Sequence, residues 1–230
     1  MHSCTIVINW RIKVRSSFLT VFPQNLFPRF CRWTVILHRF DGSGDFNRNW
    51  NDYKTGFGDT GDEIWLGNEY LHYLTNTRSY KLRFDLEDWD GFTAYAEYSS
   101  FVVTSEADKY RLLLGDYSGT TSASSSGDVT DGFLYHNNQQ FSTYDQDNDS
   151  YGDSCVNDMG SPYYGGFWYK HCSRIRPTNT HCNAASCGSS PYAHMTWNAW
   201  RGDRYSLKTI TMMMRPVTYW WRVEWLTASL

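Results

Sequence analysis

The chain has 230 residues, which is enough for one large domain or two small ones. Hydrophobic residues make up 41% and charged residues 20%, a composition that excludes a disordered chain. The formal net charge of -3 provides no overall positive field for nucleic acid, and no stretch approaches the roughly 18 apolar residues of a membrane-spanning helix. The sequence therefore predicts a folded protein that neither binds nucleic acid nor crosses a membrane.

The hydrophobic pattern predicts an α+β fold. Residues 1–31 form an atypical N-terminal segment without a sustained period, whereas 45–58 are polar and aromatic and indicate a loop. A short helix is expected over 69–76. Strands are expected over 33–39, 80–87, 92–103, 110–114 and 205–217. We expect a central, mostly antiparallel sheet at about 42–120, a loop-rich binding region at about 121–217 and a tail over 218–230.

Six cysteines occur in the chain, and an even number in a loop-rich sequence favours disulfides and an oxidising compartment. Pairing of neighbours is the simplest of the roughly fifteen possible arrangements. These pairs would be Cys4–Cys31, Cys155–Cys172 and Cys182–Cys187. Free buried thiols are one alternative. A zinc site that includes His181 and His194 is another, although the C-x2-C spacing usual in structural zinc sites is absent.

Residues 145–153 carry the strongest chemical signal. Four aspartates stand within this segment, and such like charges repel one another unless a counter-ion is present. Carboxylates and backbone carbonyls in a flexible loop supply the oxygen ligands that Ca²⁺ prefers. The segment is not an EF-hand, because neither possible register supplies the required ligands and the flanks are not helical. A solvated acidic loop is the alternative to a calcium site.

A series of motifs resembles the fibrinogen-related domain, the C-terminal module of fibrinogen chains, ficolins, tachylectins and angiopoietins. The motifs follow the family's order over residues 32–217 and include WTVI, DEIWLGN and DQDND. They lie at 33–36, 50–58, 62–68, 82–89, 135–137, 141–143, 145–149, 167–170, 205–208 and 214–216. The resemblance implies that 32–217 fold as one such domain, in its ficolin- and tachylectin-like form.

The resemblance also implies a calcium site in the acidic loop. Its side-chain ligands would be Asp147 and Asp149, and the backbone carbonyls of Tyr151 and Asp153 would complete the set. Calcium would then hold the neighbouring ligand pocket in shape, so that chelation weakens ligand binding.

A disulfide between Cys155 and Cys172, behind the calcium loop, is a further implication of the resemblance. In this family the peptide bond before the second cysteine, here His171–Cys172, is typically cis. Such a bond without proline costs about 3–4 kcal/mol, so its surroundings must hold it in place.

In ficolins and tachylectins the neighbouring pocket receives acetyl groups of N-acetylated sugars, through an aromatic slot and backbone N–H donors. The matching positions in this chain are Tyr163, His171, Cys172, Ser173, Tyr192 and Ala193. Two residues depart from the family pattern. Ser173 stands where acetyl-binding members often have His, and Asp203 stands where one branch has Trp.

We therefore expect a secreted, calcium-dependent lectin of innate-immune type that binds acetylated groups such as N-acetylated sugars. The alternative is a protein- or receptor-binding fibrinogen-like module without lectin activity. Catalysis is not expected, because neither a glycosidase carboxylate pair nor a serine-protease triad can be assembled from the sequence. Many family members cluster several binding heads for avidity, so a homo-oligomer is compatible with the resemblance.

Overall fold

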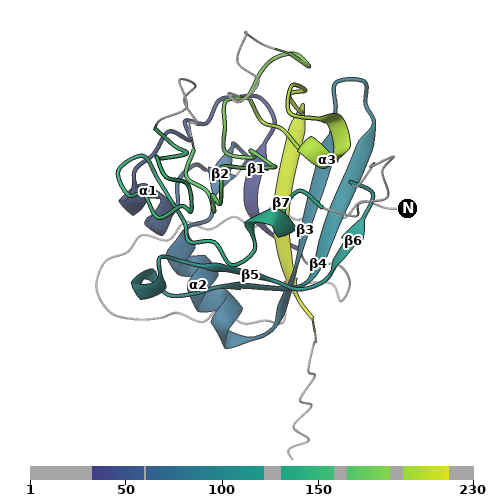
Figure 1. Cartoon of the computed structure of the whole chain (residues 1–230). Coiled ribbons are helices and arrows are strands. Elements are labelled where there is room, and N and C mark those ends of the chain that lie inside the picture. Colours follow the sequence, from purple (N-terminus) through teal and green to yellow (C-terminus); the bar gives the residue numbers. More distant parts are fainter. Residues whose placement is uncertain (1–32, 60, 122–130, 158–164, 187–193, 218–230) are drawn as a thin grey trace, which may run out of the picture.

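The computed structural model describes residues 33–59, 61–121, 131–157, 165–186 and 194–217 (Figure 1). In this part of the chain, seven strands form an antiparallel sheet in the order β2-β1-β7-β3-β4-β5, and β6 pairs with β4. The strands are β1 (Thr34–Arg39), β2 (Ile64–Trp65), β3 (Tyr80–Glu87), β4 (Thr93–Val103), β5 (Leu112–Leu114), β6 (Tyr117–Gly119) and β7 (Thr209–Pro216). The helices are α1 (Trp50–Thr55), α2 (Asn68–Thr77) and α3 (Asn198–Arg201), with short 3-10 turns at Glu106–Asp108 and Leu134–His136. The α+β class is confirmed.

The alternating strand β3 lies in the interior of the sheet, where it pairs with both β4 and β7. Its side chains alternate along the whole strand, so that Leu82, Phe84 and Leu86 are buried and the charged residues between them are half-buried. This is the burial pattern that a period of two produces when one face of a sheet packs on the core. The bounds of this strand agree with the prediction.

Two features of the sheet differ from the prediction. The expected sheet limits of 42–120 are wrong, because β1 precedes them and β7, from the far end of the chain, pairs between β1 and β3. The expected loop at 45–58 contains α1. The side chain of Asn49 caps this helix by accepting a hydrogen bond from the Asp52 N–H at 2.9 Å, a local interaction that periodicity does not reveal.

Aromatic side chains make up a large part of the buried core between the sheet and the loops that follow it. Trp168 is fully buried, lies 5.2 Å from the ring of Phe141, and donates its indole N–H to the Tyr110 carbonyl at 2.7 Å. Trp65 similarly donates to the Tyr53 carbonyl at 3.1 Å. A large ring with one polar group can pack in the core and also donate a hydrogen bond to a backbone carbonyl of a loop. In regular secondary structure, backbone N–H groups would provide such bonds. Among the described residues, no helix is both long and apolar enough to cross a membrane.

A buried ion pair joins β1 to the loops. Glu63 is 1% exposed and accepts hydrogen bonds from the backbone N–H groups of residues 40, 41, 42 and 44 and from Nε of Arg39. Arg39 also donates to the carbonyls of Pro177 and Asn179, at 3.1 and 2.8 Å. Although burial acts to raise the pKa of Glu63, the Arg39 charge and these backbone donors hold that pKa below its ordinary value.

A second buried group, His136, connects the core to the segment that follows Trp168. Its Nδ1 donates to the Trp168 carbonyl at 2.7 Å, so Nε2 is left as an acceptor, and it receives the Arg174 N–H at 3.1 Å. Burial lowers the pKa of His136 to about 3, and the positive charges of Arg176, Arg174 and Lys170 act in the same direction. The neutral ring can make both bonds, whereas a protonated ring could not accept from Arg174.

Removal of the Glu63 charge should destabilise the protein strongly. The Glu63→Gln variant leaves the buried Arg39 guanidinium without its counter-charge, so we expect a loss of about 3–5 kcal/mol in the free energy of unfolding. Urea unfolding followed by tryptophan fluorescence measures this loss. The matched control is Glu87→Gln, which breaks the half-exposed pair with Lys208 and should cost less than about 1 kcal/mol. Equal losses in the two variants would contradict the role given to Glu63.

Acidification should destabilise the fold through His136. The folded pKa lies below that of the unfolded chain, so the unfolded state binds the extra proton, and stability falls as pH drops from about 6.5 towards about 3. The loss should be about 1.4 kcal/mol per pH unit from this group. Urea unfolding at successive pH values measures the slope, which should be smaller in His136→Gln. If that variant fails to fold, NMR of the wild-type ring should show neutral His136 at pH 5, and a protonated ring would refute the assignment.

Candidate functional site

The acidic loop is organised around its two central aspartates. Asp149 accepts the Tyr151 N–H through one carboxylate oxygen and the Cys155 N–H through the other, both at 2.8 Å. Asp147 accepts the Asp149 N–H at 3.1 Å. Burial raises the pKa of Asp149, the two backbone donors oppose this, and the nearby Asp147 carboxylate raises it further. Two carboxylates that disfavour each other's charge form an arrangement that a cation would stabilise.

The donor set of this loop fits a hard cation, although carboxylates alone would not complete a site. In the described ranges no group of three or more His, Cys, Asp or Glu side chains is placed to hold a metal. Calcium sites also use backbone carbonyls, and the carbonyl of Asp153 accepts no hydrogen bond in the described structure. Asp147 and Asp149 with the carbonyls of Tyr151 and Asp153 therefore remain a suitable oxygen set for Ca²⁺.

A disulfide ties the acidic loop to a neighbouring turn. Cys155 and Cys172 are bonded, with Cα atoms 5.1 Å apart, as expected. The N–H of Ser150 also donates to the Lys170 carbonyl at 3.0 Å. Asp149 is therefore connected to the disulfide by a single hydrogen bond, from the Cys155 N–H.

The turn at 171–173 differs from the prediction at one bond. The expected cis bond between His171 and Cys172 is wrong, since the described residues contain no cis peptide. The chain reverses here by a different route: Cys172 adopts a left-handed φ of +54°, and the Lys170 N–H donates to the Cys172 carbonyl at 3.0 Å. A non-glycine residue in this region is uncommon and needs support, which the disulfide supplies.

Donors without acceptors gather at this turn. Ser173 is 9% exposed, yet its hydroxyl makes no hydrogen bond, and its backbone N–H has no acceptor in the described structure. The N–H of His171 likewise has none. Buried polar groups are nearly always paired, so the unpaired groups of Ser173 mark a place where a ligand or water would be bound. Asp203, the other departure from the family pattern, pairs with the buried Arg176 at 3.3 Å.

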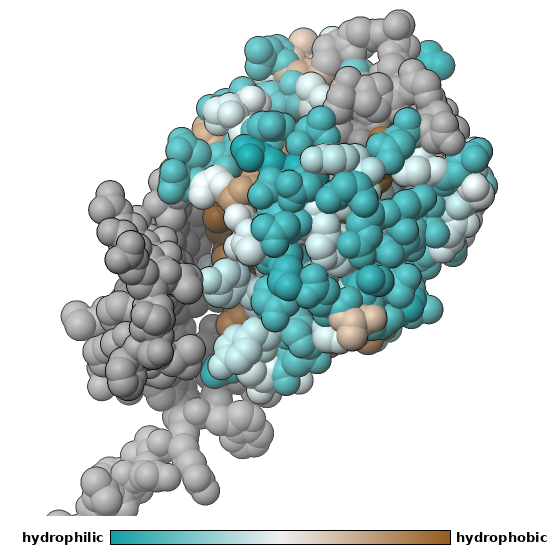
Figure 2. Space-filling view, turned by 90° about the vertical axis from the view of Figure 1, so that its left-hand side faces the viewer, coloured by the Kyte–Doolittle hydropathy of each residue, from teal (hydrophilic) through white to brown (hydrophobic). Residues whose placement is uncertain are grey.

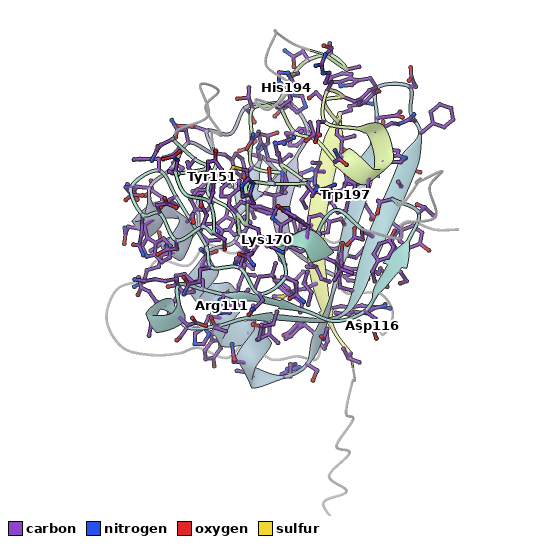
Figure 3. The ribbon with its side chains drawn as sticks, in the orientation of Figure 1. Arg111, Asp116, Tyr151, Lys170, His194 and Trp197 are labelled. Atoms are coloured by element: carbon purple, nitrogen blue, oxygen red, sulfur yellow. A yellow bond between two sulfur atoms is a disulfide. The ribbon has the colours of Figure 1, made fainter. Side chains whose placement is uncertain are left out.

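Two cations lie near one aromatic ring beside the turn, a feature that the sequence did not predict. The Nζ of Lys170 lies 5.1 Å from the ring centre of Tyr135, and Cζ of Arg174 lies 5.2 Å from it. Tyr135 donates its hydroxyl to the His171 carbonyl at 3.0 Å. Lys170 and Tyr151, labelled in Figure 3, both belong to the loops beside the sheet, and Tyr151 packs on His171 with ring centres 4.6 Å apart.

Several predicted residues lie outside the described part of the chain. They are Cys4, Cys31, Tyr163, Cys187, Tyr192 and Ala193. The acetyl-binding slot and the Cys4–Cys31 and Cys182–Cys187 pairings therefore stay predictions. Cys182 itself is disulfide-bonded, which leaves no thiolate for the zinc alternative, and its sulfur lies 3.3 Å from His194 Nδ1.

A surface cavity of about 340 Å³ lies away from these residues, between the loop at 42–47 and the segment at 178–181. Its lining includes Arg39, Phe46 and His181, and His181 belongs to the zinc alternative, but the lining contains none of the residues expected to bind calcium or the ligand. Arg39 also forms the buried ion pair with Glu63. The described residues on the face at the left of Figure 1 are mainly hydrophilic, with small hydrophobic spots between them (Figure 2).

Comparison with curated proteins identifies relatives of moderate identity. The human fibrinogen alpha chain is 43% identical over 198 residues, which cover 80% of this chain and 22% of that protein. Mouse angiopoietin-related protein 7 is 40% identical over 191 residues, which cover 81% of this chain and 52% of the relative. The chain thus spans about half or less of these proteins. They are fibrinogen and angiopoietin-related proteins, and they do not support the narrower ficolin- and tachylectin-like assignment.

Solved structures share the fold. The fibrinogen-like globe domain of human ANGPTL6 superposes with a TM-score of 0.74 at 36% identity, covering 81% of this chain and 79% of that chain. Lamprey fibrin D-dimer, in complex with the peptide ligand Gly-His-Arg-Pro-amide, gives 0.69 at 32% identity, covering 86% and 66%. Fibrinogen and angiopoietin-related proteins are secreted, so the predicted extracellular localisation is confirmed.

Residues 14–217 match the family described as fibrinogen beta and gamma chains, C-terminal globular domain. Domains of this family bind protein ligands or receptors and are binding modules rather than enzymes. The match includes the sheet, the acidic loop and the turn at 171–173. The chain therefore belongs to the fibrinogen C-terminal domain family.

Proposed function

We propose that this chain is an extracellular protein-binding module without catalytic activity, and that its acidic loop and the turn at 171–173 form the binding site. The angiopoietin-related and fibrinogen relatives favour a protein ligand over a glycan. The peptide bound by the lamprey fibrin relative is one example of a protein-derived ligand in a chain of this fold.

The observation that carries this proposal is the short connection between the two parts of the site. Asp149 holds the Cys155 N–H, and Cys155 is bonded to Cys172, whose left-handed conformation shapes the turn. The next residue, Ser173, has a hydroxyl and a backbone N–H that lack acceptors in the described structure. A site with fixed, unsatisfied donors binds its ligand without a large cost of ordering.

Calcium is proposed as the resident ion, held by Asp147 and Asp149 with the carbonyls of Tyr151 and Asp153. A bound cation would neutralise two mutually repelling carboxylates and fix their positions. The residues of this chain do the recognition: the disulfide orients the turn, and the turn presents its N–H groups to the ligand.

A calcium-dependent lectin for acetylated groups is the second candidate. The unpartnered N–H groups of His171 and Ser173 favour it, because such donors would also suit an acetyl carbonyl oxygen. The relatives give this candidate no support.

Binding arrays separate the two candidates. The immobilised chain is exposed to an array of extracellular receptor ectodomains and, in parallel, to a glycan array, each with calcium and with EDTA. We expect calcium-dependent retention on at least one ectodomain and none on acetylated glycans. Retention only on N-acetylated glycans, displaced by acetate, would reject the protein-binding proposal in favour of the lectin.

Calcium should stabilise the folded chain through the carboxylate of Asp147. At a calcium concentration about 100 times the dissociation constant, stability should rise by about 2.7 kcal/mol, because the ion binds only the folded state. Differential scanning calorimetry with calcium and with EDTA measures the shift. Asp147→Ala should abolish it. Asp153→Ala removes the same charge but keeps the backbone carbonyl, so it should retain most of the shift, and equal loss in both variants would disprove the assigned roles.

A further inference from the structure

Two positive charges beside the proposed site have no acidic partner. Lys170 and Arg174 are both exposed, and neither forms an ion pair with any carboxylate of the described residues. Many basic side chains of the described residues do have one, such as Lys81 with Glu97 at 2.7 Å and Arg111 with Asp108 at 2.9 Å. The charges of Lys170 and Arg174 are therefore available to an acceptor outside the described residues.

Each of the two charges packs near the same aromatic ring. Both lie about 5 Å from the same ring, that of Tyr135, and this ring is fixed by its hydroxyl bond to the His171 carbonyl. The buried His136 accepts the Arg174 N–H, and the charges of Arg176, Arg174 and Lys170 all act to lower the pKa of His136. Since each lies about 5 Å from that ring centre, the two charges are no more than about 10 Å apart, and one acidic segment can reach both.

The neighbouring turn adds neutral hydrogen-bond donors between the two charged residues in the sequence. Ser173 lies between the two charged positions and is more than nine-tenths buried, and both its hydroxyl and its N–H lack acceptors. Such backbone donors beside a left-handed residue are a common way of binding anionic oxygens. The segment 170–174 therefore carries two unpaired charges and, between them in the sequence, neutral donors that lack an acceptor in the described structure.

We propose that Lys170 and Arg174 select the ligand of this site, and that they bind carboxylates on an acidic segment of a protein partner, next to the donors of Ser173. This inference rests on the proposed function, since it names the chemistry of the protein that the module binds. Tyr135 acts as the positioning residue that keeps both cations at the rim of the turn.

A short acidic segment fits this surface better than a long polyanion. The Lys170 carbonyl is bonded to Ser150 of the acidic loop, so four aspartates lie in the segment next to the cations. The whole chain also carries a net charge of -3. A sulfated polysaccharide that extends beyond the two cations would meet this negative charge, whereas one or two carboxylates would not.

A titration with a defined peptide tests the inference. The probe is a head-to-tail cyclic peptide of glycine and two glutamates, which has no terminal charges, and its control carries glutamines in their place. The isotope-labelled chain is followed by NMR in millimolar calcium. The glutamate peptide should shift the signals of Tyr135 and of residues 170–174 in a saturable manner, and the glutamine peptide should not.

Charge-reversed variants locate the effect. Lys170→Glu and Arg174→Glu should each weaken binding of the glutamate peptide at least about tenfold, since a charged hydrogen bond is replaced by repulsion. The matched control is Arg78→Glu, which makes the same charge change at the exposed end of α2 and should leave the affinity unaltered. Equal weakening in Arg78→Glu would overturn the inference, because it would show a general effect of net charge.

Other outcomes would also overturn it. Shifts confined to other residues, no saturable binding, or tighter binding of a sulfated oligosaccharide to the same residues would each reject an acidic protein segment as the ligand. Failure here differs from failure of the proposed function. Receptor ectodomains could bind in the array while Lys170→Glu and Arg174→Glu leave that binding intact. In that case the protein-binding proposal is kept, and only the proposed selection of an acidic segment is rejected.

Discussion

The side chain of Arg39 joins the parts of the molecule that regular secondary structure leaves separate. It lies at the end of β1, pairs with Glu63 before β2, and donates to the carbonyls of Pro177 and Asn179 in the loops. These loops contain few strands or helices, so their backbone groups depend on individual side chains for hydrogen bonds. Arg39 and His136 provide such bonds at opposite ends of the segment 168–179, which is how a loop-rich region retains one conformation.

The charged side chains of the binding region lie in two neighbouring segments, the acidic loop and the segment 170–174. Asp147 and Asp149 accept hydrogen bonds from the backbone of their own loop, and one of these bonds joins Asp149 to the N–H of the disulfide-bonded Cys155. The cations of Lys170 and Arg174 lie near the ring of Tyr135. Neither pairs with a carboxylate of the described residues, so their charge is available to a partner.

The sequence predicted those strands and helices whose hydrophobic residues recur with a regular local period. Strand β3 was predicted with its bounds because its side chains alternate, and α2 because its period is helical. Helix α1 was missed, since it depends on the Asn49 cap and not on periodicity. The prediction of a cis peptide bond before Cys172 was wrong, because resemblance to a family does not determine an individual backbone angle. Tyr135, Lys170 and Arg174 are far apart or unremarkable in sequence, and only the folded chain brings them together.

The position of β7 has a consequence for how the chain is made. This strand is contributed by residues 209–216, yet it pairs between β1 and β3, from the first half of the chain. During synthesis the nascent chain therefore emerges with β1 and β3 unable to complete their hydrogen bonds until nearly the whole domain has left the ribosome. For that interval two strand edges and their apolar faces are exposed, a period in which a chaperone or a rapid, late zipping of the sheet must prevent association between chains.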